Sequence, residues 1–477
     1  MVAKRILFAG ATYGEEKGGR RALAPLLALP VLLFGLAAQA DETFSVQPNV
    51  VYALSATTVE GTATKPLTGF DISYVDNDAG VYVLSDSSNA AVDILDLNDP
   101  RTSGVTLNVV QPQPAGCTLP AGENLTCNFQ GHVNDPNATT VGFNDVSGPT
   151  GNMTVNHREI WAADAPVFNG PIVAGSYAND DCNASVKVVD LRTQAVTDVI
   201  DLGGCFRADE MAFDPQDQVA LIASPSETDC SIAPCPATAP KVNFITLVST
   251  KPNHKVLARI VFNGAHGTPN ALGGIEQARW NPINGLFYIA TPTDGGNASG
   301  AIAIVDPRKL RAVGKLELTN NCSPAGMFIG PAQSAVLGCG NGPVQVVDLL
   351  SGQVDALVPQ VGQVPGCDEV WYDRGQNHYL LACGPATGPA AWVAGVIDAG
   401  GNGHPIKWDT NITTQGSETV FGASHSIAAD NFTNRILVPM GDHNTLCGSA
   451  PGCVAAWVSP GDADDAPPRQ TAENDGD

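Results

Sequence analysis

The sequence predicts an all-β fold, a seven-bladed β-propeller of four-stranded blades, and three observations support it. Short β-branched runs that end in Asp recur along the chain, at residues 92–96, 186–190, 302–306, 344–348 and 394–398. Apolar runs alternate with them, at residues 219–223, 286–290, 335–339 and 378–383. The 50 Gly and 35 Pro, with 15% charged residues, are typical of short strands joined by tight turns. Units of roughly 40 to 60 residues with four short strands indicate propeller blades.

The first strand of the chain, residues 50–58, belongs to no unit of its own. The last unit, residues 425–458, offers only three strands. We expect the first strand to be the missing outer strand of the last blade, because such a clasp removes the open edge of the ring. The propeller domain then spans residues 41–460 with an insertion at 98–140, and the acidic tail 461–477 is expected to be disordered.

The units follow in order along the chain. In the first unit we expect the inner strand at residues 70–75, the next at 80–84 and the third at 91–95. In the second unit we expect the inner strand at 141–146 and the next strand at 157–162. The later units begin at Asp209, Glu276, Ala325, Asp368 and His425.

Residues 1–40 read as a secretory signal peptide. Arg20 and Arg21 precede an uncharged apolar run at residues 22–37, and Ala38-Gln39-Ala40 is a small-residue cleavage site. An uncleaved anchor is the alternative, although the run is short for a membrane span. We therefore expect a secreted or periplasmic protein without membrane insertion after cleavage.

The chain is strongly acidic, with a formal net charge of −24. Such a surface repels phosphate backbones and anionic lipid, which argues against nucleic acid or a membrane surface as partner. Solubility of an exported protein is a sufficient reason for the acidity. The partners that remain are a small molecule or a partner protein.

Twelve cysteines in an exported chain favour disulfides over a metal cluster. Two pairs occupy equivalent positions in successive units, where each joins the start of an inner strand to the end of the next strand outward. We therefore predict nearest-neighbour pairing throughout: Cys117 with Cys127, Cys182 with Cys205, Cys230 with Cys235, Cys322 with Cys339, Cys367 with Cys383, and Cys447 with Cys453.

Acidic and polar residues recur at one depth of the predicted axial channel. Aligning the units on their Asp-Pro and Asn-Pro turns places at one position Asp71, Asp209, Glu276, Ala325, Asp368 and His425. The next position carries Glu210, Gln277, Gly326, Glu369 and Ser426, and the second unit contributes Asn144 and Asp145. Carboxylates that face one another repel unless a cation or protons neutralise them.

A divalent metal is one answer to this repulsion. Ca²⁺ or Mg²⁺ takes oxygen ligands, so we expect such an ion to be held by Asp209, Glu276, Asp368 and His425. The alternative is that these residues cap loops and bind backbone N–H groups, while Arg207 and Arg279 pair with the carboxylates.

Three further residues are candidates for acid–base chemistry. Glu210 and Glu369 lie next to the predicted metal ligands, and His266 lies in the loop before Glu276, where a histidine titrates near neutrality. A polar surface role is the alternative for His266. His157 precedes a second strand and is expected on the opposite face. The Asp residues that end the repeated strands, Asp96, Asp190, Asp306, Asp348 and Asp398, are expected to form turns by binding backbone two residues on.

The repeated Val-x-Val-Val-Asp-Leu and Ala-Phe-Asp-Pro units, over residues 65–460, resemble the YVTN-type propeller repeats of exported bacterial proteins. This resemblance implies a propeller fold and a binding role. The axial carboxylates are similar in plan to those of the gluconolactonase and senescence-marker propellers, which hold a divalent metal on the axis and open lactones. Those propellers have six blades, whereas this sequence shows seven units.

Two functions are open at this point. In the first, the chain is a metal-assisted hydrolase or lactonase acting on a small molecule or sugar-derived ester; the metal polarises the carbonyl and activates water, and Glu210, Glu369 or His266 is the base. In the second, it is a non-catalytic ligand- or protein-binding propeller. The chain has no Gly-x-Ser-x-Gly elbow, His-Glu-x-x-His motif, phosphate loop or dinucleotide fingerprint.

Overall fold

Short strands make up the regular structure of the described residues, where helix is confined to two 3-10 turns, η1 (Pro331–Gln333) and η2 (Thr445–Cys447). The computed structural model describes residues 44–45, 47–99, 106–112, 117, 119, 125–131, 148–165, 176–177, 183–204, 207–225, 235–236, 242–359, 366–384, 393–401, 405–413, 426–442 and 444–458. These residues belong to a unit that spans Glu42–Asp477. No helix among them is long and apolar enough to cross a bilayer.

Several predictions fall outside the described residues. These are the signal peptide, the acidic tail, the candidate residues Asn144, Asp145 and His425, and the disulfides Cys182–Cys205 and Cys230–Cys235, of which Cys235 alone is described.

Five sheets of the described residues have four strands each, and in each sheet the strands follow one another in chain order. The first is β6 (Asn152–Val155), β7 (Glu159–Asp164), β9 (Ala184–Asp190) and β10 (Ala195–Gly204); the second is β11 (Met211–Asp214), β12 (Val219–Ser224), β14 (Phe244–Ser249) and β15 (Val256–Val261). The third is β16 (Ala278–Asn281), β17 (Leu286–Thr291), β18 (Ala301–Asp306) and β19 (Arg311–Glu317); the fourth is β20 (Pro324–Ile329), β21 (Ser334–Cys339), β22 (Val344–Asp348) and β23 (Gln353–Val358). The fifth is β24 (Cys367–Asp373), β25 (His378–Cys383), β26 (Val393–Asp398) and β27 (Lys407–Thr413), and β8 (Ser176–Tyr177) pairs separately with β13 (Cys235–Pro236).

The first and last units form one eight-stranded sheet, which the prediction of separate blades did not include. Its order is β2 (Ser73–Asp76), β3 (Val81–Asp86), β4 (Ala91–Asp96), β5 (Thr106–Val110), β1 (Val50–Leu54), β30 (Cys453–Val458), β29 (Arg435–Met440) and β28 (Ala428–Asp430). β1 pairs antiparallel with β30, the pairing predicted for the first strand, and also parallel with β5. One strand therefore joins the two units.

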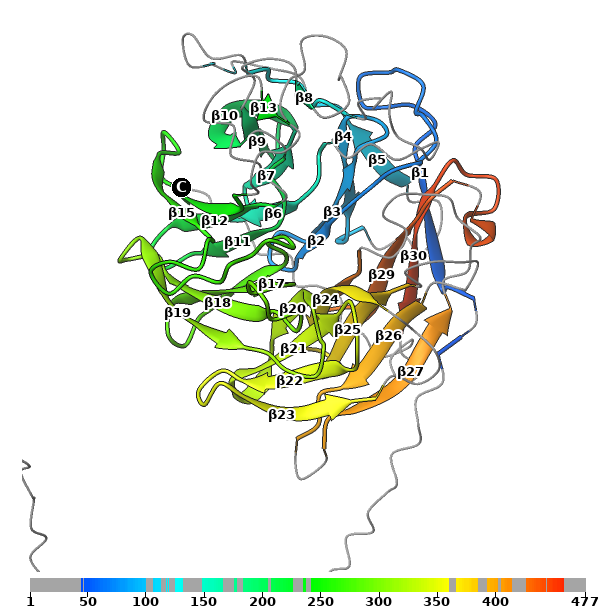
Figure 1. Cartoon of the computed structure of the whole chain (residues 1–477). Coiled ribbons are helices and arrows are strands. Elements are labelled where there is room, and N and C mark those ends of the chain that lie inside the picture. The colour runs from blue at the N-terminus through cyan, green and yellow to red at the C-terminus, as the bar shows by residue number, and fades with distance from the viewer. Residues whose placement is uncertain are drawn as a thin grey trace, which may run out of the picture. The chain divides into compact units, whose positions relative to one another are not determined.

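The first strands of successive units contact one another in series. β2 contacts β6, and the series continues through β11, β16, β20 and β24 to β28, which in turn contacts β2. Figure 1 shows β2, β6, β11, β20 and β24 nearest the centre of the sheets. Residues at the two ends of these inner strands therefore gather around one axis.

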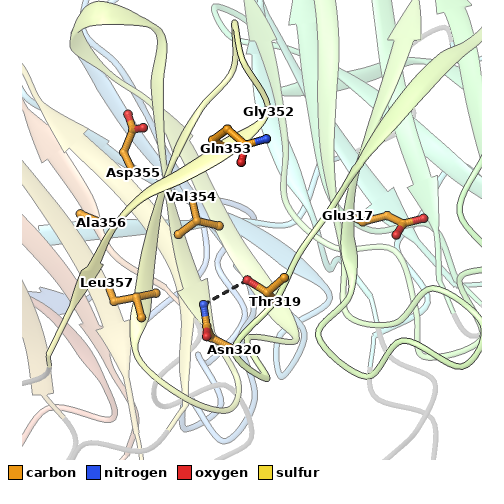
Figure 2. Close-up of a pocket in the computed structure, with 9 residues that line it drawn as sticks. All are labelled: Glu317, Thr319, Asn320, Gly352, Gln353, Val354, Asp355, Ala356 and Leu357. Atoms are coloured by element: carbon orange, nitrogen blue, oxygen red, sulfur yellow. Dashed lines mark hydrogen bonds between the residues drawn. The ribbon is translucent and has the colours of Figure 1, made fainter.

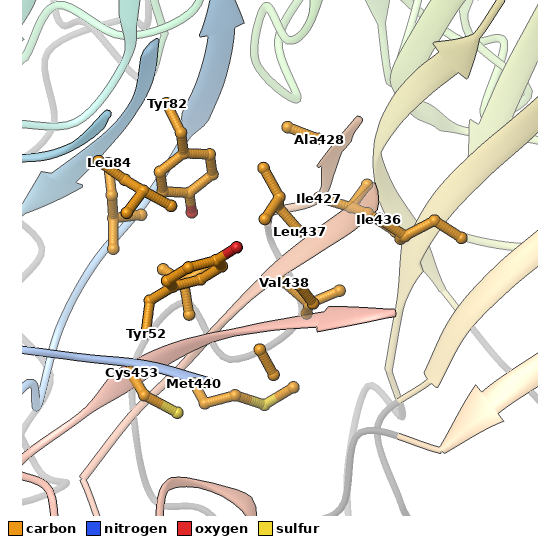
Figure 3. Packing of buried hydrophobic residues seen from close by; sticks show 14 of the residues in the cluster. Tyr52, Tyr82, Leu84, Ile427, Ala428, Ile436, Leu437, Val438, Met440 and Cys453 are labelled. Atoms are coloured by element: carbon orange, nitrogen blue, oxygen red, sulfur yellow. The ribbon is translucent and has the colours of Figure 1, made fainter. Parts of the chain in front are cut away.

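Apolar side chains fill the space between neighbouring sheets. Between the first and last units, Tyr52 of β1, Tyr82 of β3 and Leu437 of β29 belong to one cluster and are at most 2% exposed (Figure 3). Burying a side chain of this size contributes about 1.5–3 kcal/mol. The second strands β3, β12 and β25 are buried along their whole length, as strands covered on both faces must be.

Aspartates end the strands and form the turns, as predicted. The side chains of Asp96, Asp306, Asp348 and Asp398 each accept a hydrogen bond from the backbone N–H two residues on, and Asp190 accepts one from three residues on. The same turn follows the inner strands at Asp76, Asp214, Asn281, Asp373 and Asp430. Each such bond satisfies a donor that the strand leaves unpaired.

Four of the predicted disulfides lie within the described residues and are confirmed: Cys117–Cys127, Cys322–Cys339, Cys367–Cys383 and Cys447–Cys453. In the register of β24 and β25, Cys367 and Cys383 are direct partners. The bond therefore joins the start of an inner strand to the end of its neighbour.

The inner strand of the second unit is not the one predicted. Residues 141–146 lie outside the described residues, and β6 holds the inner position, with Asn152 opposite Ala162. A three-residue connection, residues 156–158, in which Asn156 and His157 have positive φ, sets this register. The predicted contributors Asn144 and Asp145 therefore do not belong to β6.

Candidate functional site

One end of the axial channel carries four carboxylates around one arginine. Arg207 Nη2 lies 2.9 Å from Asp209 Oδ2, and its Nη1 lies 3.6 Å from Asp71 Oδ2. Burial opposes the charge of the guanidinium, but Asp209, Asp71, Glu276 and Asp368 outweigh it and raise the pKa of Arg207. The pairing of Arg207 with the carboxylates, which the sequence left as an alternative, is therefore present.

Arg207 supplies part of the positive charge that we expected from a metal ion. Within the described ranges, no group of three or more His, Cys, Asp or Glu side chains could hold a metal. His425, the fourth predicted ligand, lies outside those ranges. The metal set of Asp209, Glu276, Asp368 and His425 therefore stays a prediction.

The next layer along the axis contains a buried pair of acids. Burial, and after it the charge of Glu369, raises the pKa of Glu210. Burial also raises the pKa of Glu369 to about 8, against the opposing effect of Arg279. Glu369 Oε2 accepts hydrogen bonds from Ser426 Oγ at 3.0 Å and from the Ile427 N–H at 3.1 Å. At neutral pH the pair therefore holds a proton and shares the charge of one arginine.

Gln277 and Arg279 of the same layer join neighbouring sheets. Gln277 Oε1 accepts the backbone N–H groups of Met327, at 2.6 Å, and Val370, at 3.0 Å. Arg279 Nη2 donates to the Val370 carbonyl at 3.1 Å, and its guanidinium lies 4.7 Å from the ring centroid of Phe328. Both side chains are thus held by backbone and ring contacts across three units.

His266 is placed apart from these groups. It is exposed, and its φ of 53° puts it in a turn of the loop 263–270. A Cβ on the adjacent Gly267 would lie 3.7 Å from the backbone nitrogen of Gly314, which belongs to the outer strand β19. Among the described residues His266 has no contact with the axial carboxylates, and its role as a base stays a prediction.

A cavity of about 690 Å³ opens at the other end of the inner strands. It is lined by the last residues of these strands and the turns after them, including Pro215, Pro282 and Pro331. Eight of its lining side chains are aromatic or methionine: Tyr74, Met153, Met211, Phe213, Trp280, Phe328, Trp371 and Tyr372. We call this cavity the aromatic funnel.

The rings of the aromatic funnel contact one another across units. Tyr74 meets Trp371 edge-on, with ring centroids 5.4 Å apart and an interplanar angle of 83°. Phe328 lies 5.7 Å from Trp371 and 6.3 Å from Tyr372. The Arg279 guanidinium lies over Phe328 and 5.6 Å from the Trp371 ring, so that a cation–π contact links the funnel to the acidic layer.

Polar groups lie at the mouth of the aromatic funnel. Asp76 accepts hydrogen bonds from Thr154 Oγ1 at 2.6 Å and pairs with His157 Nδ1 at 2.8 Å. His157 is thus at the opposite end of the inner strands from Arg207 and its carboxylates, as predicted. Arg374, which follows β24, is exposed, and its backbone N–H donates to Asn431 Oδ1 at 3.1 Å.

A second hollow, of about 410 Å³, lies between the outer strands β19 and β23 (Figure 2). Glu317, Gln353 and Asp355 line it, with Asn320 Nδ2 donating to Thr319 Oγ1 at 3.0 Å. Its lining is mainly polar, and the apolar members are Val354, Ala356 and Leu357. It offers no aromatic surface comparable with that of the aromatic funnel.

The aromatic funnel was not predicted from the sequence, because the predicted site lies at the start of the inner strands. Tyr74, Arg279 and Trp371 each lie two positions before the Asp or Asn that ends such a strand. Side chains two residues apart share a face of a strand. The aromatic residues Tyr74 and Trp371 at this aligned position were the signal that could have revealed the funnel.

Comparisons with known proteins support the fold through one solved structure. No family model matches the chain, and no curated protein matches its sequence. A chain in the "Crystal Structure of Mitotic Checkpoint Complex" matches with a TM-score of 0.53 and 9% identity, over 92% of this chain and 98% of that one. Because the matched chain is a propeller, this similarity shows the fold. The chain is an all-β propeller.

A second solved structure, "Kuenenia stuttgartiensis Hydrazine Synthase", matches with a TM-score of 0.48 and 11% identity, over 83% of this chain and 98% of that one. Since no family model matches the propeller, its resemblance to the YVTN-type repeats stays a prediction.

Proposed function

We propose that the chain is an exported, non-catalytic binding propeller of seven blades, whose aromatic funnel holds a flat and largely apolar ligand. The blade count takes the eight-stranded sheet as the first and last blades joined by β1. The four disulfides of the described residues fit an oxidising compartment. The observation that carries the proposal is the cavity, because its 690 Å³ falls within the range of about 300–1,000 Å³ typical of ligand pockets.

The lining sets the shape of the ligand. Phe213, Trp280, Phe328 and Tyr372 are only partly buried and present ring surface within the funnel. An aromatic contact contributes about 0.5–1.5 kcal/mol beyond the area it buries. A planar molecule that touches two such rings gains from both.

Metal-assisted hydrolysis at the acidic end is the alternative. Asp209 there is paired with Arg207, and Glu210 and Glu369 share Arg279, so the carboxylates already have cationic partners. We therefore place binding ahead of hydrolysis. Elemental analysis of protein purified without chelator tests this ranking of the two functions. About one metal ion per chain, lost in Asp209→Asn, would favour hydrolysis over binding.

The neutral dye N-phenyl-1-naphthylamine tests the aromatic funnel, because it fluoresces in apolar surroundings. We expect saturable binding that Trp280→Ala weakens about tenfold, through loss of a stacking wall. Ile283, 74% exposed at the same mouth, can be changed without touching the core, and Ile283→Asp should also weaken binding.

The matched control is Leu350→Ala, because Leu350 is a 76% exposed residue in the turn after β22. Its dye affinity should equal that of the wild type. Thermal melting establishes that each variant is folded. Unchanged affinity in both funnel variants, or no saturable binding at all, would refute the proposed function.

A further inference from the structure

We propose that the ligand of the aromatic funnel carries a carboxylate, and that the Arg374 guanidinium binds it at the mouth. This inference rests on the proposed function, since it assigns the ligand's polar group within the same cavity. The observations that support it are the placement of Arg374, the charges that face it, and the net charge of the chain.

Arg374 has no ion-pair partner among the described residues. It lines the funnel directly after Tyr372 and is exposed. Its backbone N–H is engaged by Asn431, but its guanidinium forms no hydrogen bond or ion pair with any described residue. Arg207, by contrast, pairs with Asp209. The planar fork of Arg374 is therefore available for a carboxylate of a ligand.

The acidic groups at the mouth have partners of their own. Asp76 is 3% exposed and is bound by Thr154, His157 and the N–H groups of Asp78 and Ala79. Asp78 is 73% exposed, and its Oδ2 lies 3.5 Å from His157 Nε2. These groups belong to the first and second units, whereas Arg374 follows β24. The mouth thus has an acidic side that is occupied by histidine and a basic side that is open.

The floor of the funnel holds a second arginine, whose charge is offset by the buried acids. Arg279 lies against Phe328 and donates to two backbone carbonyls, and the buried acids Glu210 and Glu369 lie beneath it. A flat ligand that stacks on the funnel rings extends from this floor towards Arg374. An anionic group at its outer end is attracted to the Arg374 guanidinium, whereas a cationic group there is repelled.

A ligand with one negative charge is favoured over a ligand with several. The chain carries a net charge of −24, which repels a polyanion such as a phosphate ester more strongly than a monoanion. A single guanidinium matches one carboxylate through two parallel N–H···O bonds. An aromatic monocarboxylate satisfies the rings, the volume and the charge together.

Two isosteric probes separate charge from shape: naphthalene-2-carboxylate and its neutral amide, naphthalene-2-carboxamide. Titration calorimetry near 0.15 M salt, where the Debye length is about 8 Å, limits the long-range repulsion of the acidic surface. We expect the carboxylate to bind roughly five- to tenfold more tightly than the amide. In Arg374→Gln the two probes should bind equally, with the amide unchanged.

Arg311→Gln is the control, because Arg311 is an exposed arginine on the outer strand β19 and its loss changes the net charge by the same amount. It should leave the ratio of the two affinities unaltered. Equal binding of both probes to the wild type, or the same loss in both arginine variants, would overturn the carboxylate proposal. Failure of the neutral dye to bind would instead overturn the proposed function.

Discussion

At the scale of single residues, His254 shows how one side chain joins two sheets. It lies in the turn between β14 and β15, with Nδ1 2.7 Å from Asp198 Oδ2 and Nε2 3.6 Å from Glu159 Oε2. Trp161 donates to Glu159 and meets the imidazole edge-on, with ring centroids 5.2 Å apart. Burial opposes protonation, but the hydrogen bonds with Asp198 and Glu159 outweigh it and raise the pKa of His254 to about 9.

This contact predicts a pH-dependent stability. A histidine whose pKa is about 9 when folded, and about 6.5 when unfolded, stabilises the fold fully below pH 6.5, and this contribution is lost as the pH rises through 9. His254→Gln should therefore cost about 2 kcal/mol at pH 6, after allowance for solvent screening. The measurement is the free energy of unfolding of both proteins from pH 6 to pH 10. A difference that does not shrink between pH 7 and pH 10 would refute the ion-pair explanation.

The sequence could reveal some of these residues and not others. Arg207 lies two positions before Asp209, so its pairing was foreseeable from local spacing. His254 and Asp198 are separated by 56 positions, and only the packing of two sheets brings them together. That Arg374 has no ion-pair partner within the described part of the chain could not be predicted from spacing either, because it depends on how several units pack.

At the scale of elements, the sequence repeat predicted the structure correctly where successive units are alike. Cys322–Cys339 and Cys367–Cys383 are equivalent in two successive units, and the predicted pairing follows from that equivalence. The second unit departs from the template, because its inner strand β6 reads Asn-Met-Thr-Val and ends without an Asp-Pro turn. Alignment by turn residues could not place it. Physical pairing with β7 decided its position instead.

The disulfides predict a ranking of stabilities. Cys322–Cys339 closes a loop with a sequence separation of 17, and Cys447–Cys453 one of 6. In the chain-entropy description, Cys322–Cys339 contributes about 3 kcal/mol to the free energy of unfolding and Cys447–Cys453 about 2 kcal/mol. Replacing both cysteines of a pair by serine should therefore lower the free energy of unfolding more for Cys322 and Cys339. Denaturant titration of the two double variants measures this, and the reverse order would contradict it.

At the scale of the whole molecule, β1 determines how the first and last units meet. Its residues Val50 to Ala53 pair with β30, and Ala53 and Leu54 pair with β5. On the channel side, Ser426 Oγ lies 2.6 Å from Ser73 Oγ, and the Asn431 N–H donates to Asn77 Oδ1 at 2.9 Å. The sequence predicted the partner β30 from the missing fourth strand. The parallel contact with β5 was not predictable, because it depends on how the two sheet edges approach.

Removal of β1 should therefore open the molecule at this seam. A chain that starts at residue 56 leaves the edges of β5 and β30 unpaired and removes the buried side chains of Tyr52 and Leu54, which are 2% and 4% exposed. We expect a loss of about 5 kcal/mol in the free energy of unfolding and concentration-dependent association in size-exclusion chromatography, because free edges pair with other chains. A synthetic peptide of residues 47–56 should restore both properties by strand addition, whereas a scrambled peptide should not. A truncated chain that remains monomeric and as stable as the chain from residue 41 would show that the seam is held by the channel-side contacts alone.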